Sequence, residues 1–236
     1  MEQTRIPTFV TPLAQGAVNE LLPHYRGIYA GYGSDDSVRD SFERTDLILH
    51  FGPLETDVTT FMNTSKLAER LVISFHDEHM QIGEKKFTGL YLKPTVQALL
   101  SRISNFKPKD VVQSVQEVQE CAPRRWTAQR PDGNITHDFL WQYIGRFLQQ
   151  GDIVVTETGT ASFGIFDTIL PRDCLLLNPS LWASIGYCVG AAQGAALAAK
   201  EEGTNRRTIL FEGDGSFQVT CQEVSTMIKE DLRVTM

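Results

Sequence analysis

Residues 208–218 read TILFEGDGSFQ, and this stretch indicates the class of fold because it joins a strand, a turn and a helix start. Residues 208–211 form a short apolar run, which is typical of a strand inside a parallel sheet. The turn 213–216 is Gly-Asp-Gly-Ser, and an amphipathic helix could follow it. Open parallel sheets bind ligands beyond the carboxyl ends of their strands, so this turn is a candidate ligand site.

The residue types in the turn indicate a metal-bound diphosphate. Gly213 and Gly215 let the backbone turn sharply and approach a ligand closely. Asp214 is a hard oxygen ligand suited to Mg²⁺, which usually takes one or two carboxylates together with substrate phosphates. The first N–H groups of the following helix favour phosphate. The alternative is a tight turn without a ligand, which is the more frequent meaning of an isolated Gly-Asp-Gly motif.

Two further segments are expected at the same end of the sheet. Residues 156–160, Thr-Glu-Thr-Gly-Thr, follow a strand and offer hydroxyl groups and a glycine to a polar ligand. Residues 178–186, NPSLWASIG, place the apolar Ile185 in front of a helix. Three such segments could face one site.

Composition and charge narrow the class of protein. The chain of 236 residues is 42% hydrophobic and 22% charged, as expected for a globular α/β protein. Its net charge of −7 and the lack of a basic stripe argue against nucleic acid as a partner. The longest apolar run, residues 185–199, is shorter than the roughly 20 residues that span a bilayer. A cytoplasmic protein is expected, with free and mostly buried thiols at Cys121, Cys174, Cys188 and Cys221.

Strand-like and helix-like segments alternate, which predicts an α/β fold with two parallel-sheet, three-layer units. Strands are expected at 8–11, 27–31, 47–52, 70–75, 152–159 and 208–213, and helices at 13–22, 35–46, 93–103, 136–150 and 183–200. The predicted domains are 1–110 and 136–236, joined by a proline-containing linker at 111–135.

Two of the predicted helices have distinctive faces. In the helix that Thr136 should cap, an apolar stripe is expected from Phe139, Leu140, Tyr143, Phe147 and Leu148, with Gly151 as the stop. In the helix 183–200, Gly186, Gly190 and Gly194 leave one face almost without side chains. Another backbone could approach that face, either within the chain or from a second subunit.

These segments resemble a known family, the 2-keto acid decarboxylases that depend on thiamine diphosphate, and fungal pyruvate decarboxylases in particular. The matching runs include FVTPLAQGAVNE, FHDEHMQIG, GDIVVTETGTASFGI, LWASIGYCVGAAQGAALA and ILFEGDGSFQVTCQEVSTMIK. The resemblance implies an incomplete middle domain, without its first strand and helix, at 1–110. It implies an incomplete diphosphate-binding domain at 136–236.

The resemblance also implies a site, residue by residue. Asp214 corresponds to the metal ligand, and Thr158 to a residue at both the cofactor and the substrate. Ile185 corresponds to the apolar residue that holds the cofactor bent, and Ala183 stands where many members have Gly. The cofactor-binding residues that the resemblance implies are Thr158, Gly159, Thr160, Ala183, Ser184, Ile185, Gly213, Gly215 and Ser216.

The implied activity is non-oxidative decarboxylation of a 2-keto acid, with pyruvate favoured, using Mg²⁺ and thiamine diphosphate. An indolepyruvate or phenylpyruvate decarboxylase is an alternative, as is a non-catalytic partner of a full-length decarboxylase. The family forms homodimers and homotetramers. No catalytic residue is assigned here, because the activating glutamate belongs to a pyrimidine-binding domain with no counterpart in this sequence. These residues alone are therefore expected to be inactive and prone to aggregate.

Several other residues favour structural roles. His76 and His79 lie three apart around two carboxylates, but the spacing is not that of a zinc-binding HExxH motif. Cys221 is expected to be packed, and Trp141, Phe163 and Trp182 are expected in the core.

Overall fold

The computed structural model describes residues 6–67, 71–103 and 132–236. By their contacts the residues form two compact units. The first comprises Met1–Thr11 and Leu22–Pro123, and the second comprises Pro12–Leu21 and Arg124–Met236. The segment Pro12–Leu21 thus groups with the second unit, although the sequence placed it in the first. Most of the predicted linker, up to residue 131, lies outside the described residues.

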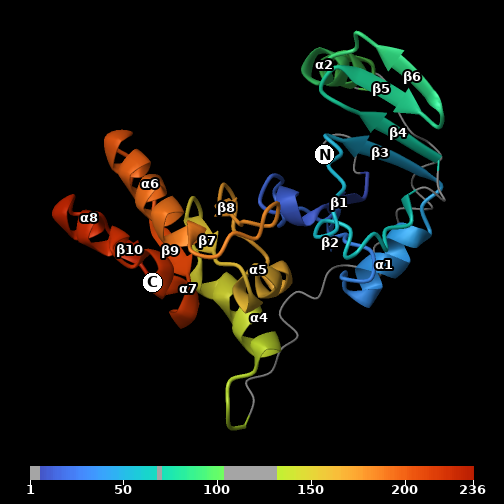
Figure 1. The fold of residues 1–236 in the computed structure, drawn as a ribbon. Coiled ribbons are helices and arrows are strands. Elements are labelled where there is room, and N and C mark those ends of the chain that lie inside the picture. Colours follow the sequence, from blue (N-terminus) through green and yellow to red (C-terminus); the bar gives the residue numbers. More distant parts are fainter. Residues whose placement is uncertain (1–5, 68–70, 104–131) are drawn as a thin grey trace. The chain divides into compact units, whose positions relative to one another are not determined.

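The first unit is an α/β structure with two sheets, and each sheet contains one pair of parallel strands. One sheet pairs β1 with β2, and the other has the order β3-β4-β5-β6 (Figure 1). Its elements are β1 (Thr8–Val10), β2 (Tyr25–Ile28), α1 (Asp36–Glu43), β3 (Leu47–Phe51), β4 (Leu71–Phe75), β5 (His79–Ile82), β6 (Lys85–Thr88) and α2 (Leu92–Ile103).

The larger sheet of the first unit is mixed, which corrects the expectation of a parallel sheet. Only β3 and β4 are parallel, whereas β4, β5 and β6 run antiparallel. The connections between these antiparallel strands, residues 76–78 and 83–84, are too short for a parallel crossover. Gly83, with φ of +55°, begins the turn between β5 and β6. A Gly-Glu pair between two short strands is typical of a hairpin, and this pattern was missed in the sequence.

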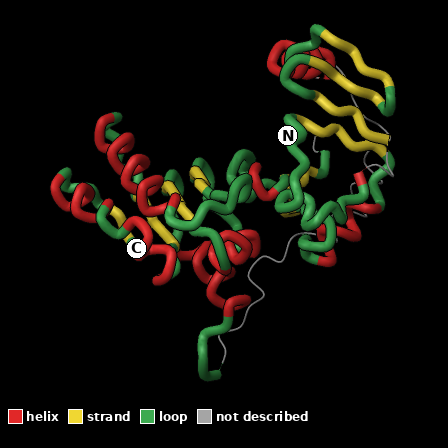
Figure 2. Tube along the Cα trace, in the orientation of Figure 1, coloured by secondary structure: helices red, strands yellow, loops and turns green. Residues whose placement is uncertain are grey.

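The second unit is a three-layer structure around a parallel sheet of order β10-β9-β7-β8, shown as yellow strands between red helices in Figure 2. This confirms the α/β class. The elements are η1 (Pro12–Ala14), α4 (His137–Phe147), β7 (Ile153–Thr156), α5 (Thr160–Gly164), η3 (Ile165–Asp167), β8 (Leu175–Leu177), α6 (Tyr187–Glu201), β9 (Thr208–Phe211), α7 (Asp214–Thr220), α8 (Glu223–Lys229) and β10 (Val234–Thr235).

Successive side chains of β7 and β9 point to opposite faces of this sheet, and a hydrophobic core lies on each face. Val154 and Ile209 pack with Trp141 and Ile144 of α4. Val155 and its neighbours pack with the small residues of α6 and with Met227 of α8. Both faces are therefore covered, which is why β7 reads as a continuous apolar run.

Helix α4 begins as predicted, but a different face is buried. The Thr136 side chain accepts a hydrogen bond from the N–H of Phe139 at 3.4 Å, so Thr136 caps the helix. Of the predicted stripe only Leu148 is buried, while Tyr143 is 51% and Phe147 45% exposed. The buried face consists of Trp141, Ile144 and Leu148, which belong to the core cluster on this side of the sheet.

The predicted helix 13–22 is wrong beyond the single turn of η1. Gly16 has φ of +80°, and a β-carbon there would lie 3.3 Å from Leu170 Cδ1. Gln15 Nε2 donates to the carbonyl oxygens of Ile165 at 2.9 Å and Thr168 at 3.2 Å. These contacts within the second unit hold the segment in an irregular path.

Glu20 completes that irregular segment. It is 1% exposed, and its carboxylate accepts the N–H groups of Leu170 at 2.9 Å and Gly16 at 3.0 Å. Burial raises the pKa of Glu20 to about 7, although the two hydrogen bonds oppose that shift.

Helix α6 contains most of the longest apolar run of the sequence. The face that carries Gly186, Gly190 and Gly194 is only partly covered. A β-carbon on Gly186 would lie 2.7 Å from Val219 Cγ1, so the expected close approach exists there. At Gly190 and Gly194 a β-carbon would meet nothing within 4 Å among the described residues. None of the helices in the described ranges has the length and hydropathy needed to cross a membrane.

Gly164 of the second unit is tightly constrained by a neighbouring side chain. A β-carbon there would lie 1.9 Å from Trp141 Nε1, and Trp141 is 4% exposed in the core. We expect Gly164→Ala to lower the free energy of unfolding by about 1–3 kcal/mol or more, because the indole ring cannot move without disturbing α4. Urea unfolding of the chain measures this.

Gly190→Ala is the matched control for that substitution. Gly190 lies in the interior of α6 with open space around it, so alanine should stabilise by about 0.5–1 kcal/mol through helix propensity. Equal unfolding midpoints for the two variants would contradict the packing of α5 against α4.

Candidate active site at the carboxyl edge of the second sheet

The parallel register of the second sheet brings three loop segments to one edge. Thr156 pairs with Phe211, and Val155 pairs with Leu177. The peptide N–H of Glu157 donates to the carbonyl of Phe211 at 2.9 Å, which extends the pairing past β7. Residues 157–160, 178–186 and 212–216 therefore all leave the sheet on its carboxyl side, where ligands bind in open parallel sheets.

The Gly-Asp-Gly turn presents an uncovered carboxylate. Gly213 is extended, with φ of −80° and ψ of 142°, and precedes α7. Asp214 is exposed at the first position of that helix. A β-carbon on Gly215 would meet nothing within 4 Å, and one on Gly213 only Ser216 Oγ at 3.9 Å. Neither glycine is thus required by the chain's own backbone or packing, which corrects the sharp-turn argument and leaves room for an external group.

The Thr158–Thr160 segment owes its path to one glycine. Gly159 has φ of 120° and ψ of −145°, a conformation essentially confined to glycine. Thr160 is exposed and starts α5. Thr158 Oγ1 is buried and has no hydrogen-bond partner among the described residues. A hydroxyl in that state fits a polar ligand.

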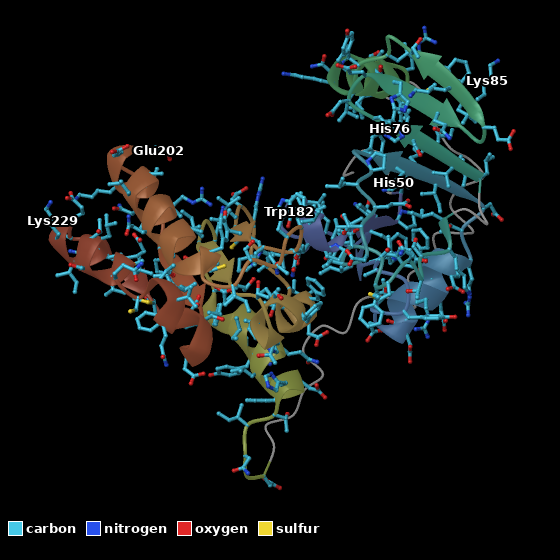
Figure 3. All side chains as sticks on the ribbon, viewed as in Figure 1. His50, His76, Lys85, Trp182, Glu202 and Lys229 are labelled. Carbon is cyan, nitrogen blue, oxygen red and sulfur yellow. The ribbon has the colours of Figure 1, made fainter. Side chains whose placement is uncertain are left out.

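Ala183, Ser184 and Ile185 lie in the loop before α6, not in the helix predicted there. Ala183 has φ of 48°, a left-handed conformation that favours glycine. Ile185 is 61% exposed and Trp182 82%, so Trp182 is not the core residue expected (Figure 3). The Thr220 hydroxyl donates to the Gly186 carbonyl at 2.8 Å, which joins this segment to the end of α7.

Two glutamates that the sequence analysis did not single out lie together beyond β7 and β9. Glu157 is 1% exposed; its Oε1 accepts the Thr158 N–H at 2.8 Å and its Oε2 accepts the Cys188 N–H at 3.3 Å. Both Glu212 carboxyl oxygens are buried without a hydrogen-bond donor among the described residues. Burial, and then the negative charge of Glu157, raise the pKa of Glu212 to about 7.

The available signal for this pair was positional: each glutamate directly follows an apolar strand run. The pair also explains the neighbouring cysteine. Cys188 Sγ donates to the Thr156 carbonyl at 3.4 Å. Burial, with the charges of Glu157 and Glu212, raises the pKa of its thiol, which therefore stays protonated.

The remaining cysteines and aromatic residues divide between core and surface. Cys174 is buried and unpaired, whereas Cys221 is free and exposed, not packed as expected. Cys121 lies outside the described residues. Trp141 lies in the core, and Phe163 is 52% exposed, contrary to expectation.

The donor set fits a metal that takes few protein ligands. Within the described ranges, no three His, Cys, Asp or Glu side chains are grouped so that they could hold an ion. Asp214 is an exposed carboxylate, and carboxylates are the side chains that Mg²⁺ takes in small number beside phosphate and water. His76 and His79 of the first unit stack face to face, with ring centroids 4.1 Å apart.

Comparison with known proteins shows two protein-family models that match this chain. The chain matches the model of the thiamine pyrophosphate enzyme central domain over residues 1–103. It matches the model of the thiamine pyrophosphate enzyme C-terminal TPP binding domain over residues 158–236.

Similar proteins include pyruvate decarboxylases of fungi. That of Aspergillus fumigatus is 41% identical over 232 residues, which are 98% of this chain and 40% of that protein. Pyruvate decarboxylase isozyme 3 of Saccharomyces cerevisiae is 38% identical over 236 residues, 99% of this chain and 41% of that protein. The chain therefore spans about two fifths of the length of these relatives. With both family models matched and similarity along nearly its whole length, the chain belongs to the thiamine pyrophosphate enzyme family.

Proposed function

We propose that the second unit provides part of a Mg²⁺–thiamine diphosphate site of a pyruvate decarboxylase-like enzyme. One observation supports this most: residues 157–160, 183–186 and 212–216 meet at one sheet edge, where Asp214 and Gly215 are uncovered. The proposed reaction is the non-oxidative decarboxylation of a 2-keto acid to an aldehyde. The cofactor, when bound, supplies a thiazolium ring that accepts the electrons released with carbon dioxide.

Each residue of the site has a proposed role in binding. Asp214 would hold Mg²⁺ and, through it, the diphosphate, while Gly213, Gly215 and Ser216 leave their backbone N–H groups near that anion. Ile185 would support the cofactor rings, with Ser184 beside it and the Ala183 carbonyl as a hydrogen-bond acceptor. Thr158 and Thr160 would direct hydroxyl groups to cofactor and substrate, with Gly159 shaping the path between them.

Pyruvate is the favoured substrate because the similar fungal proteins are named pyruvate decarboxylases. An indolepyruvate or phenylpyruvate substrate is the alternative within the same chemistry. We further propose a cytoplasmic location and assembly with copies of itself. Exposed Trp182, Ile185 and Val219 beside the site favour a covering partner, which could also be a full-length decarboxylase. Co-purification from the source cells would identify it.

Asp214→Ala tests the metal role. The substitution is made in a chimera completed with the remaining domains of the Aspergillus fumigatus relative, so that the whole site is present. Charge-assisted contacts are worth about 1.5–3 kcal/mol, so affinity for thiamine diphosphate in the presence of Mg²⁺ should fall roughly ten- to a hundredfold. Calorimetric titration measures the affinity.

Asp138→Ala is the control for that experiment, since Asp138 is also exposed in the first turn of a helix of the second unit. It should bind the cofactor as the parent chimera does. Unchanged affinity in Asp214→Ala would mean that the Gly-Asp-Gly segment is a turn without a metal.

The 236 residues alone should form no aldehyde from pyruvate. The physical reason is that the activating glutamate of the family has no counterpart among them, so the cofactor would not reach its reactive form. An assay coupled to alcohol dehydrogenase and NADH measures this, with the chimera as the positive control. Turnover by the chain near that of the chimera would refute the expectation.

A further inference from the structure

We propose that Glu157 is a positioning residue of this site. It fixes the distance between the loop at residues 158–160 (the Thr158 loop) and the start of α6. The inference rests on the proposed function, because it assigns a role within the same site. Glu157 acts through two peptide N–H groups, those of Thr158 and Cys188, one from each segment. Those segments are distant in sequence, since Cys188 follows Glu157 by 31 residues.

The Thr158 loop depends on hydrogen bonds more than on packing. A β-carbon on Gly159 would meet nothing within 4 Å, so neighbouring side chains do not confine this part of the loop. Two hydrogen bonds hold it among the described residues: Glu157 Oε1 accepts the Thr158 N–H at 2.8 Å, and Ser162 Oγ donates to the Gly159 carbonyl at 3.1 Å. Glycine is conformationally permissive, so the peptide before it must be fixed by such a bond.

The start of α6 lacks a cap of its own. Its N-cap residue is Gly186, which has no side chain to accept a hydrogen bond. Glu157 Oε2 accepts the first-turn N–H of Cys188 instead, at 3.3 Å. A carboxylate is favoured at a helix N-terminus because the helix dipole is positive there. Residues 183–186, directly before α6, are thus held by a carboxylate on another strand end.

The Glu157 carboxylate can fix other segments because its own position is fixed. Glu157 is buried, and its peptide N–H is bonded to Phe211, the residue that leads into the Gly-Asp-Gly turn. One residue therefore connects all three segments: 212–216 through its backbone, and the other two through its side chain. Removing the carboxylate should release two segments while leaving the strands in place.

Two variants of the 236-residue chain test this by amide hydrogen exchange. In Glu157→Gln one carboxylate oxygen becomes an NH₂ group that cannot accept, so exchange should rise roughly ten- to a hundredfold at Thr158, Cys188 or both. In Glu157→Asp the shorter side chain should still reach Thr158, as Asp57 reaches the Val58 N–H at 2.9 Å in this chain. Only Cys188 should then lose protection.

Glu202→Gln is the matched control, because Glu202 is an exposed glutamate at the other end of α6 (Figure 3). It should leave both amides unchanged. Unchanged exchange at Cys188 in Glu157→Asp would overturn the proposal. Faster exchange throughout β7 and β9 in both Glu157 variants would also overturn it, because Glu157 would then support the whole sheet.

Calorimetric titration with Mg²⁺ and thiamine diphosphate separates this proposal from the proposed function, with the same substitutions made in the completed chimera. Affinity should fall in both Glu157 variants and stay unchanged in Glu202→Gln. If the parent chimera binds the cofactor and the Glu157 variants bind it equally well, the positioning role is wrong. If the parent chimera binds none, the proposed function fails, and the exchange pattern alone decides whether Glu157 fixes the two segments.

Discussion

The parallel pairing of β7 with β9 is the constraint on which the second unit depends. It is clamped at its start, where Arg207 donates to both carboxylate oxygens of Asp152, at 2.5 and 2.9 Å, and Asp152 is 2% exposed. The Gln149 N–H donates to the same carboxylate at 2.7 Å. A bidentate pair of this kind fixes geometry as well as adding energy. A slip of one residue would turn every side chain of the strand to the other face, so this ion pair also helps determine which residues reach the candidate site.

At the opposite edge the same register determines the chemistry. Because Ile153, Val155 and Glu157 alternate to the α6 face, the strand that builds a core also delivers a carboxylate to the helix start. Glu212 directly follows β9 in the same way that Glu157 follows β7. Its pKa is raised because it is buried and lies near the charge of Glu157. Two residues further on, Asp214 is exposed. Acidic residues that lie close in sequence thus divide into buried carboxyl groups and one carboxylate that is open to an external group.

Local sequence patterns predicted the elements whose stabilisation is local. Thr136 as a cap and the apolar run of β9 both follow from side-chain spacing and short-range hydrogen bonds. Spacing failed where distant contacts decide. Residues 13–22 have helical periodicity, but Gly16 and Glu20 are committed to partners at Leu170, which no local pattern contains.

The candidate site was predicted in the same uneven way. Its three segments could be found because strand ends of a parallel sheet converge, and the family resemblance named residues within them. The Glu157–Cys188 bond could not be found, because it depends on the rotation of α6 about its axis. The exposure of Trp182 was missed because an aromatic residue in a loop does not reveal which way it points.

The convergence of three segments on one cofactor can be mapped by backbone amide chemical shifts, measured while the chain is titrated with Mg²⁺ and thiamine diphosphate. We expect the largest changes in 157–160, 183–187 and 212–216, and none at the β5–β6 hairpin or at Asp152 and Arg207. Changes that cluster instead in the first unit, around His76 and His79, or that are absent from the Gly-Asp-Gly segment while the ligand binds, would contradict it.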